Sequence, residues 1–240
     1  MAKSFKIFYD HFSPLSRSLL ILFERNNVEC EKISVALRKG EHLSEEFGDK
    51  INRFHKVPVI HDSDGFRLAE SIAIFHYLGR RGIFEERWYP KNDIKKLSQI
   101  DEFMQWHHNS LAFSAASIFY NAWIKPIREI NMLEHGMMRN VRDPLNYVDI
   151  DNSLDLLENT WLKENKFIVG EEPTFAEILA SCTLMQVIGL RLFRLDEQKY
   201  QKVTKWLNAT KSYFNPEFDE LHKYIYKYGE KFNGKSPFEN

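Results

Sequence analysis

Apolar and polar positions near the N-terminus follow first the two-residue period of a strand and then the longer period of a helix. In the first strand Phe5, Ile7 and Tyr9 share one face and Phe8 adds an apolar residue opposite, which is typical of a largely buried strand. Over residues 15–23 apolar side chains recur at helical spacing, and two asparagines follow as a stop signal. The pattern predicts a strand that leads directly into a helix.

The alternation of strand and helix patterns continues to residue 82. A second strand is predicted over 33–37 and a short helix over 43–50. Strands over 57–61 and 66–68 flank Asp64-Gly65, a strong hairpin signal. A helix over 71–79 follows, with Ser71 as a suitable N-cap. The order β-α-β-α-β-β-α predicts an α/β domain over residues 1–82, parallel in its first half and closed by an antiparallel hairpin.

Strand signals vanish after residue 93, and the pattern becomes helical. Apolar stripes at helical spacing run over 97–111, 150–161 and 175–185, and a last amphipathic helix is predicted over 218–228. Thr174 and Glu177 match a capping box. Residues 83–92 have no clear period and are interpreted as a linker. We therefore expect an all-α domain over 93–240, in which residues 231–240 form a loose, frayed tail because they contain two chain breakers and little apolar surface.

Composition and charge narrow the classes of function. The chain has 240 residues, enough for two domains, and its formal net charge of -1 gives no electrostatic reason to expect nucleic acid or a membrane as partner. Cys30 and Cys182 lie far apart and suggest no disulfide framework. The first strand begins almost at the N-terminus, and no apolar run is long enough to span a bilayer. We expect a globular protein of the cytoplasm.

The histidines do not predict a metal site. His107 and His108 are adjacent, so on a helix their side chains project about 100° apart and are poorly placed to bind one ion. His107 falls on an apolar stripe and is interpreted as a core histidine with a satisfied hydrogen bond. His222 and the lysines near it are interpreted as a solvated helix face.

Ser13 stands at the junction of the first strand and the first helix. Pro14 suits the first helical position, which makes Ser13 the natural N-cap. Its hydroxyl would then lie at the helix end that favours an anion. From this segment alone, a plain capping role is the simpler interpretation. A nucleophilic Ser13 is disfavoured because no Gly-x-Ser-x-Gly turn accompanies it, and dithiol chemistry is disfavoured because no cysteine lies nearby.

Several segments in register resemble the theta class of glutathione transferases, and most closely its insect members. The motifs are residues 8–13, 38–43, 56–58, 68–74, 88–90 and 101–107, and the resemblance covers nearly the whole chain. It implies a thioredoxin-like domain followed by an all-α helical domain that carries the second-substrate pocket. It also implies glutathione as co-substrate and a homodimer.

The resemblance assigns roles residue by residue. Ser13 would donate a hydrogen bond to the glutathione thiolate. The Val57 backbone would pair with the cysteinyl unit, before a cis Pro58. The remaining positions would hold the two ends of glutathione: Glu70 and Ser71 the γ-glutamyl group, His42 and Lys56 the glycyl carboxylate.

This chain departs from the theta pattern at two places. Pro14 stands one position earlier than the usual proline, which leaves Ser16 as a rival hydrogen-bond donor. Ala112 occupies a position where theta enzymes commonly carry arginine. With Asp101, His108 and Phe119 it is expected on a helix face that lines the second-substrate pocket. This pocket is expected to be open and to accept larger neutral electrophiles than a lidded theta enzyme would.

Two functions follow from these residues. The first is a transferase that adds the glutathione thiolate to small apolar electrophiles, with a glutathione-dependent peroxidase side activity. One hydrogen bond to a charged group contributes roughly 1.5–3 kcal/mol, which lowers a thiol pKa by about one to two units. The alternative is a non-catalytic carrier of apolar ligands on the same fold. The pKa of the bound glutathione thiol distinguishes the two functions: a lowered pKa indicates the transferase, and an unshifted pKa favours the carrier.

Overall fold

The computed structural model describes residues 5–124 and 150–235. Four strands form one sheet in the order β2-β1-β3-β4, namely β1 (Lys6–Tyr9), β2 (Glu31–Ser34), β3 (Val59–His61) and β4 (Arg67–Ala69). β1 and β2 are parallel, whereas β3 is antiparallel to both β1 and β4. With α1 (Pro14–Arg25), α2 (Glu45–Lys50) and α3 (Ser71–Arg80), the predicted order β-α-β-α-β-β-α is confirmed.

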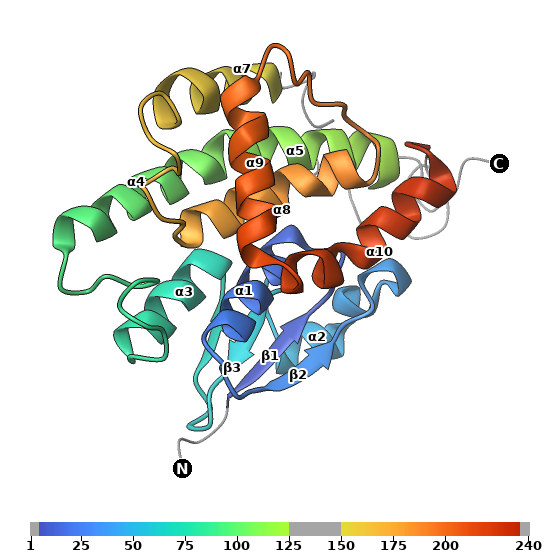
Figure 1. The fold of residues 1–240 in the computed structure, drawn as a ribbon. Coiled ribbons are helices and arrows are strands. Elements are labelled where there is room, and N and C mark those ends of the chain that lie inside the picture. Colours follow the sequence, from blue (N-terminus) through green and yellow to red (C-terminus); the bar gives the residue numbers. More distant parts are fainter. Residues whose placement is uncertain (1–4, 125–149, 236–240) are drawn as a thin grey trace.

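A layer of helices covers the sheet domain (Figure 1). No strand lies after β4 in the described residues, as the second half of the sequence pattern predicts. The helices are α4 (Ile94–Asn109), α5 (Leu111–Phe119), α7 (Ile150–Leu156), α8 (Phe175–Gly189), α9 (Gln201–Phe214) and α10 (Glu217–Phe232). Short 3-10 turns occur at Leu37–Lys39 and Glu41–Leu43, and π-helical turns at Tyr120–Ile124 and Leu157–Trp161.

α1 begins and ends where the sequence predicts, and it lies between the sheet and the helical layer. Ser13 caps it by accepting the Ser16 N–H at 3.2 Å, and Pro14 is its first residue. Residues 16–23 are all buried, polar ones included, because the helix packs against α8 and α10 on the side away from the sheet. A helix that is buried all round connects the two halves through one shared core.

The rest of that core also crosses between the halves. The ring of Phe75 on α3 stacks on that of Phe175 on α8, with centroids 4.4 Å apart. Between α3 and α4, the segment that includes the predicted linker 83–92 contains no helix or strand, but it buries Trp88 and Tyr89. Thr174 and Glu177 form the predicted capping box at the start of α8.

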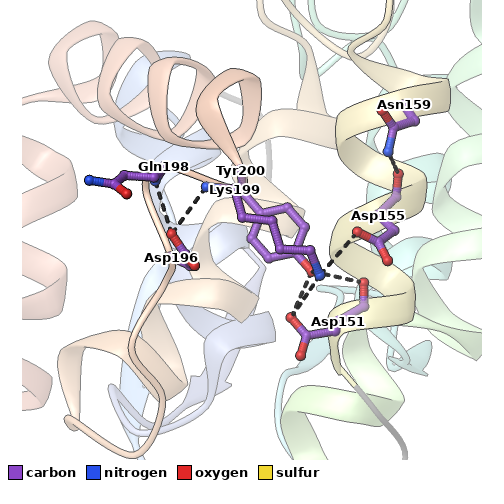
Figure 2. A network of polar contacts seen from close by, with 7 residues as sticks. All are labelled: Asp151, Asp155, Asn159, Asp196, Gln198, Lys199 and Tyr200. Carbon is purple, nitrogen blue, oxygen red and sulfur yellow. Dashed lines mark hydrogen bonds and ion pairs between the residues drawn. The ribbon is translucent and has the colours of Figure 1, made fainter.

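A polar network fastens the loop before α9 to α7 (Figure 2). The Tyr200 hydroxyl donates to the Asp151 carboxylate at 2.6 Å, and the Lys199 ammonium lies 3.4 Å from Asp155. Burial and the hydrogen bond to Asp151 raise the pKa of Tyr200 to about 12, so this hydroxyl stays a donor at neutral pH. The network stabilises the helical layer and contains none of the predicted site residues.

Three sequence-based boundaries are wrong. The second strand lies at Glu31–Ser34 and not at 33–37, because the chain turns into a 3-10 helix at Leu37, whose N–H donates to the Asp10 carboxylate. The stripe over 97–111 belongs to two helices, since the backbone breaks at Ser110 with φ -122° and ψ -84°. Ser71 is the first helical residue of α3, while Glu70 takes the N-cap position without a side-chain bond.

The C-terminal region also differs from the prediction. α10 extends to Phe232, so residues 231 and 232 are helical and not part of a loose tail. Residues 236–240 of the predicted tail lie outside the described residues. Gly229 permits a close approach of α10 to α8, because a Cβ there would lie 1.9 Å from the Gly189 carbonyl oxygen. His222 is fully buried, and its Nδ1–H donates to the Phe218 carbonyl at 2.7 Å, so it does not belong to a solvated face.

His107 is a core histidine, as predicted. It is 1% exposed, and its Nε2 lies 3.0 Å from the Thr183 hydroxyl oxygen. That hydroxyl donates to the Leu179 carbonyl, so the oxygen accepts the proton of the histidine. Both cysteines are free. No helix within the described ranges is long and apolar enough to cross a membrane.

Candidate active site

The register of the sheet brings most of the predicted site segments to one end. Phe8 of β1 pairs with Val59 of β3, and Val59 pairs with Ala69 of β4. The loop that carries Ser13 leaves the end of β1, Val57 precedes β3, and Glu70 follows β4. β2 is parallel to β1, so the turn that leads to His42 leaves the same end of the sheet. Segments far apart in the sequence therefore meet at this edge.

Ser13 lies at the centre of this edge. It is 9% exposed, and its hydroxyl is 3.5 Å from the carbonyl oxygen of Val57, which it faces as a donor. The Ser13 hydroxyl oxygen in turn accepts the Ser16 N–H at 3.2 Å as the helix cap. Ser16, the rival donor, is 0% exposed, so its hydroxyl lies beneath the surface that a ligand would contact. Of these two serines, Ser13 is the one that caps α1 and keeps some exposed surface.

Asp10 fixes the loop between β1 and α1, a role that the sequence analysis did not identify. One carboxylate oxygen accepts the Phe12 N–H at 2.7 Å, and the other accepts the Leu37 N–H at 2.9 Å. The Asp10 carbonyl accepts the Ser13 N–H at 3.0 Å. An aspartate side chain often accepts the backbone N–H of the second residue after it, which forms an Asx-turn. An aspartate directly after a predicted strand is therefore a sequence signal for such a turn. Asp10 thus joins the Ser13 loop to the segment after β2.

The Val57–Pro58 peptide bond is cis, as predicted. The chain just before it is held by Asn52, which is 6% exposed and donates its side-chain N–H to the Lys56 carbonyl at 2.8 Å. The Lys56 side chain is exposed. Asn52 therefore orders the backbone on which both predicted residues, Lys56 and Val57, are carried.

His42 lies half-buried in the turn before α2. Burial, together with the nearby His55, lowers the pKa of its imidazole, so His42 is neutral at neutral pH. His55 Nδ1 bonds the His42 carbonyl at 2.7 Å. Gly48 leaves room for that ring, since a Cβ there would lie 2.7 Å from it. Of the two residues predicted to hold a carboxylate, Lys56 supplies the charge, and His42 can supply a neutral hydrogen bond.

Glu70 and Ser71 stand at the N-terminus of α3. The Glu70 backbone adopts φ 70°, and its side chain is exposed. Ser71 is 4% exposed, and the Glu70 carbonyl accepts the Ile74 N–H as the first bond of the helix. The amides of the first turn precede this bond and have no acceptor within the helix. The exposed carboxylate and the free amides together can hold a group that carries both an ammonium and a carboxylate.

An aromatic cluster borders the Ser13 loop and comes from three distant segments. Phe12, directly before Ser13, contacts Trp123 with ring centroids 5.6 Å apart and Tyr228 at 5.0 Å. Phe119 and Phe232 complete this aromatic cluster through Trp123. The predicted pocket residue Phe119 thus lies next to the Ser13 loop, and α10 forms part of the wall.

The other two residues predicted for the second-substrate pocket are separated by the helix break. His108 is exposed on α4, and Ala112 is half-buried on α5. Because the backbone breaks at Ser110, these residues do not share the continuous helix face that the sequence pattern predicts.

Two further features lie apart from this edge. A surface hollow of about 490 Å³ opens between α8 and α9, lined by Met185, Ile188 and Leu207 among others, and it includes no predicted site residue. Within the described ranges, no group of three or more His, Cys, Asp or Glu side chains is placed to hold a metal ion.

A thioredoxin-like domain with a cis-proline turn, followed by a helical domain, defines a class of protein that includes the glutathione transferases. The model of the glutathione S-transferase N-terminal domain matches residues 5–80, and that of the C-terminal domain matches residues 148–212. Glutathione S-transferase T1 of Arabidopsis thaliana is 34% identical over 95% of this chain and 91% of its own length. Glutathione S-transferase theta-1 of Rattus norvegicus is 30% identical over 77% of this chain and 73% of its own length.

Solved structures agree with these sequence matches. A human glutathione transferase theta-2, determined as a complex with glutathione and an unknown ligand, superposes with a TM-score of 0.81 and 26% identity, covering 98% of this chain and 95% of its own. The apo form of human glutathione S-transferase T1-1 superposes with a TM-score of 0.78. This chain belongs to the glutathione S-transferase family. It is a transferase, and its similarity to theta-class members confirms the class that the sequence motifs indicate.

Proposed function

We propose that this transferase joins glutathione to small apolar electrophiles and that the Ser13 hydroxyl stabilises the reacting thiolate. The observation that carries the proposal is the position of Ser13. Ser13 is 9% exposed, and its hydroxyl lies at the N-terminus of α1 and faces the Val57 carbonyl only at a long 3.5 Å. Such a weak intramolecular bond is easily exchanged for a bond to a charged sulfur atom.

Glutathione would replace the contact that Ser13 makes in the free protein. The cysteinyl unit would pair with the Val57 backbone as a neighbouring strand does, so its N–H would take the Val57 carbonyl. The Ser13 hydroxyl would then turn to the sulfur. A charge-assisted hydrogen bond contributes roughly 1.5–3 kcal/mol and lowers the thiol pKa by about one to two units.

The reaction itself is a nucleophilic substitution or addition by the sulfur. For an alkyl halide, the thiolate attacks carbon, a carbon–sulfur bond forms, and the halide leaves with the bonding electrons. The serine oxygen keeps its proton throughout and does not become a nucleophile. Reduction of a peroxide by the same thiolate is a side activity that we also propose, on the resemblance to the theta class.

The remaining predicted residues bind the rest of glutathione. Glu70 would pair with the ammonium of the γ-glutamyl end, and Ser71 with the first-turn amides of α3 would hold its carboxylate. Lys56 would pair with the glycyl carboxylate, assisted by a neutral His42. Support comes from the common sheet edge and from the exposure of Lys56 and Glu70.

The decisive experiment is a pH titration of thiolate absorbance for glutathione bound to the protein, with free glutathione as reference. We expect the bound thiol to titrate about one to two units below the free thiol. If the pKa of the bound thiol equals that of free glutathione, the enzymatic role of Ser13 is wrong. The alternative, a non-catalytic carrier of apolar ligands, is then favoured.

Assembly and location are proposed on the same resemblance. We expect a homodimer, and sedimentation that gives a species of 28.6 kDa at micromolar concentration would contradict it. We place the protein in the cytoplasm, because its two cysteines are free and far apart, as in reducing compartments.

A further inference from the structure

Arg17 is a fully buried arginine one turn after Ser13 on α1. It is 0% exposed, and its backbone N–H donates to the Ser13 carbonyl at 3.1 Å. The guanidinium lies at the contact between α1 and α8, where the sheet domain and the helical layer meet.

The guanidinium joins the Ser13 loop to α8. One terminal nitrogen donates to the carbonyl of His11, two residues before Ser13. The other donates to the Cys182 carbonyl at 3.2 Å and to the Gln186 side-chain oxygen at 2.8 Å. Cys182 and Gln186 are four residues apart on α8, so one terminal nitrogen of the guanidinium spans one helical turn there. The other terminal nitrogen bonds the Ser13 loop.

The partners of the Arg17 guanidinium are carbonyl and amide oxygens. Within the described residues, no aspartate or glutamate forms an ion pair with Arg17, and Asp10 contributes only a more distant negative charge. Burial lowers the pKa of the guanidinium to about 10, which leaves it protonated at neutral pH. A buried charge without an opposite charge costs free energy, and an apolar residue of similar volume often serves stability equally well. General stabilisation therefore does not account for an arginine here.

We propose that Arg17 is a positioning residue that sets the aim of the Ser13 hydroxyl. It holds the His11 carbonyl, while Asp10 holds the Phe12 amide and the segment after β2. Arg17 thereby ties the loop to α8, and Asp10 ties it to the sheet domain. The Ser13 side chain projects from the end of this loop. This inference rests on the proposed role of Ser13.

The test compares Arg17→Met with Arg25→Met. Arg25 is on the same helix about three turns from Ser13, and it also bridges to the helical layer, through the Tyr213 carbonyl and Glu217. We expect Arg17→Met to raise the pKa of the bound glutathione thiol by about one unit and to lower kcat about tenfold, with the glutathione KM changed less than about threefold. Arg25→Met should change the thermal midpoint only.

Two more variants separate geometry from charge. Arg17→Lys keeps a cation but cannot reach both His11 and α8, so its kcat should stay low, and full recovery would overturn the positioning role. Gln186→Met keeps the arginine and removes one of its acceptors, and we expect a smaller shift of the thiol pKa in the same direction. If Arg17→Met fails to fold, Gln186→Met decides, and an unchanged thiol pKa there would overturn the inference.

Ser13→Ala, measured in parallel, keeps this inference distinct from the proposed function. If Ser13→Ala raises the thiol pKa and Arg17→Met does not, only the role of Arg17 is wrong. If Ser13→Ala leaves the thiol pKa unchanged, the proposed role of Ser13 fails, and the inference about Arg17 fails with it.

Discussion

The hydroxyl of Ser13 lies 3.5 Å from the carbonyl oxygen of Val57, 44 residues further along the chain. The contact joins the N-terminus of α1 to the turn before β3, and it is too long for a strong hydrogen bond. Each partner has a more favourable bond available from a ligand: an N–H for the carbonyl, and an anionic sulfur for the hydroxyl. In the free protein the Ser13 hydroxyl and the Val57 carbonyl are thus held in place, and each remains able to form a stronger hydrogen bond to a ligand.

Ser13→Ala should lower the turnover number by about tenfold or more and leave the affinity for glutathione within a few-fold. The reason is a loss of roughly 1.5–3 kcal/mol of thiolate stabilisation while the other binding contacts remain. Steady-state kinetics with a small alkyl halide would measure both. Ser16→Ala is the matched control, because Ser16 is 0% exposed. Loss of turnover in Ser16→Ala alone would reverse the assignment.

Glu70→Ala should act on binding and not on turnover. Glu70 is exposed at the N-terminus of α3, where it would meet the γ-glutamyl end of glutathione, away from the sulfur. The glutathione KM should rise strongly while kcat at saturation stays nearly unchanged. Glu70 has φ 70°, a conformation that glycine adopts more readily than alanine. Glu70→Gly therefore removes the carboxylate without backbone strain and serves as a control for strain in Glu70→Ala. An unchanged KM in both variants would remove Glu70 from the site.

Asp62→Asn should destabilise the sheet domain in a pH-dependent way. Burial opposes ionisation of Asp62, but hydrogen bonds from Tyr77 and Ser63 and the charge of Arg81 outweigh it and lower the pKa below the usual 3.8. A lowered pKa in the folded state stabilises the fold above the unfolded value and is lost as pH falls through the folded value. Urea unfolding should show a cost of about 1.5–3 kcal/mol at neutral pH that shrinks below about pH 4. A constant difference across pH would contradict this.

His107→Gln should flatten the acid dependence of stability. Burial, with a small contribution from His108, lowers the pKa of His107 from 6.5 to about 3. The neutral imidazole is the form that fits the core, so its contribution is complete above pH 6.5 and is lost as pH falls from 6.5 towards 3. Glutamine can keep a bond to Thr183 without titrating. Thermal unfolding over this range should show a shallower slope for the variant.

His108→Gln is the control for this measurement, because His108 is exposed on the same helix and acts on His107 only as a neighbouring charge, so the slope should change far less than in His107→Gln. The stability of His107→Gln should still depend somewhat on acid pH, since burial also lowers the pKa of His222. A slope that matches the unmodified protein in His107→Gln would show that His107 does not govern the transition.

Much of the sheet domain is determined by short-range rules in the sequence. The Ser13 cap, Pro14 at the first helical position and the asparagine at the end of α1 act within a few residues of one another, so the sequence alone predicts this helix correctly. The hairpin around Gly65 follows from its φ of 90°, a conformation that glycine adopts readily. In the helical domain, the capping box of Thr174 and Glu177 at the start of α8 is equally local.

The tertiary structure decided what depends on distant partners. Arg17 looks like one polar residue on an amphipathic helix. Its acceptors on α8 nevertheless lie more than 160 residues further along the chain, and Cys182 is 165 residues away. The burial of His222 and the extension of α10 to Phe232 depend on packing against α1, α8 and Trp123. Capping and periodicity are set by neighbours within one or two turns, which the sequence displays. Burial of a given side chain is set by which elements pack together, and only the folded chain determines that.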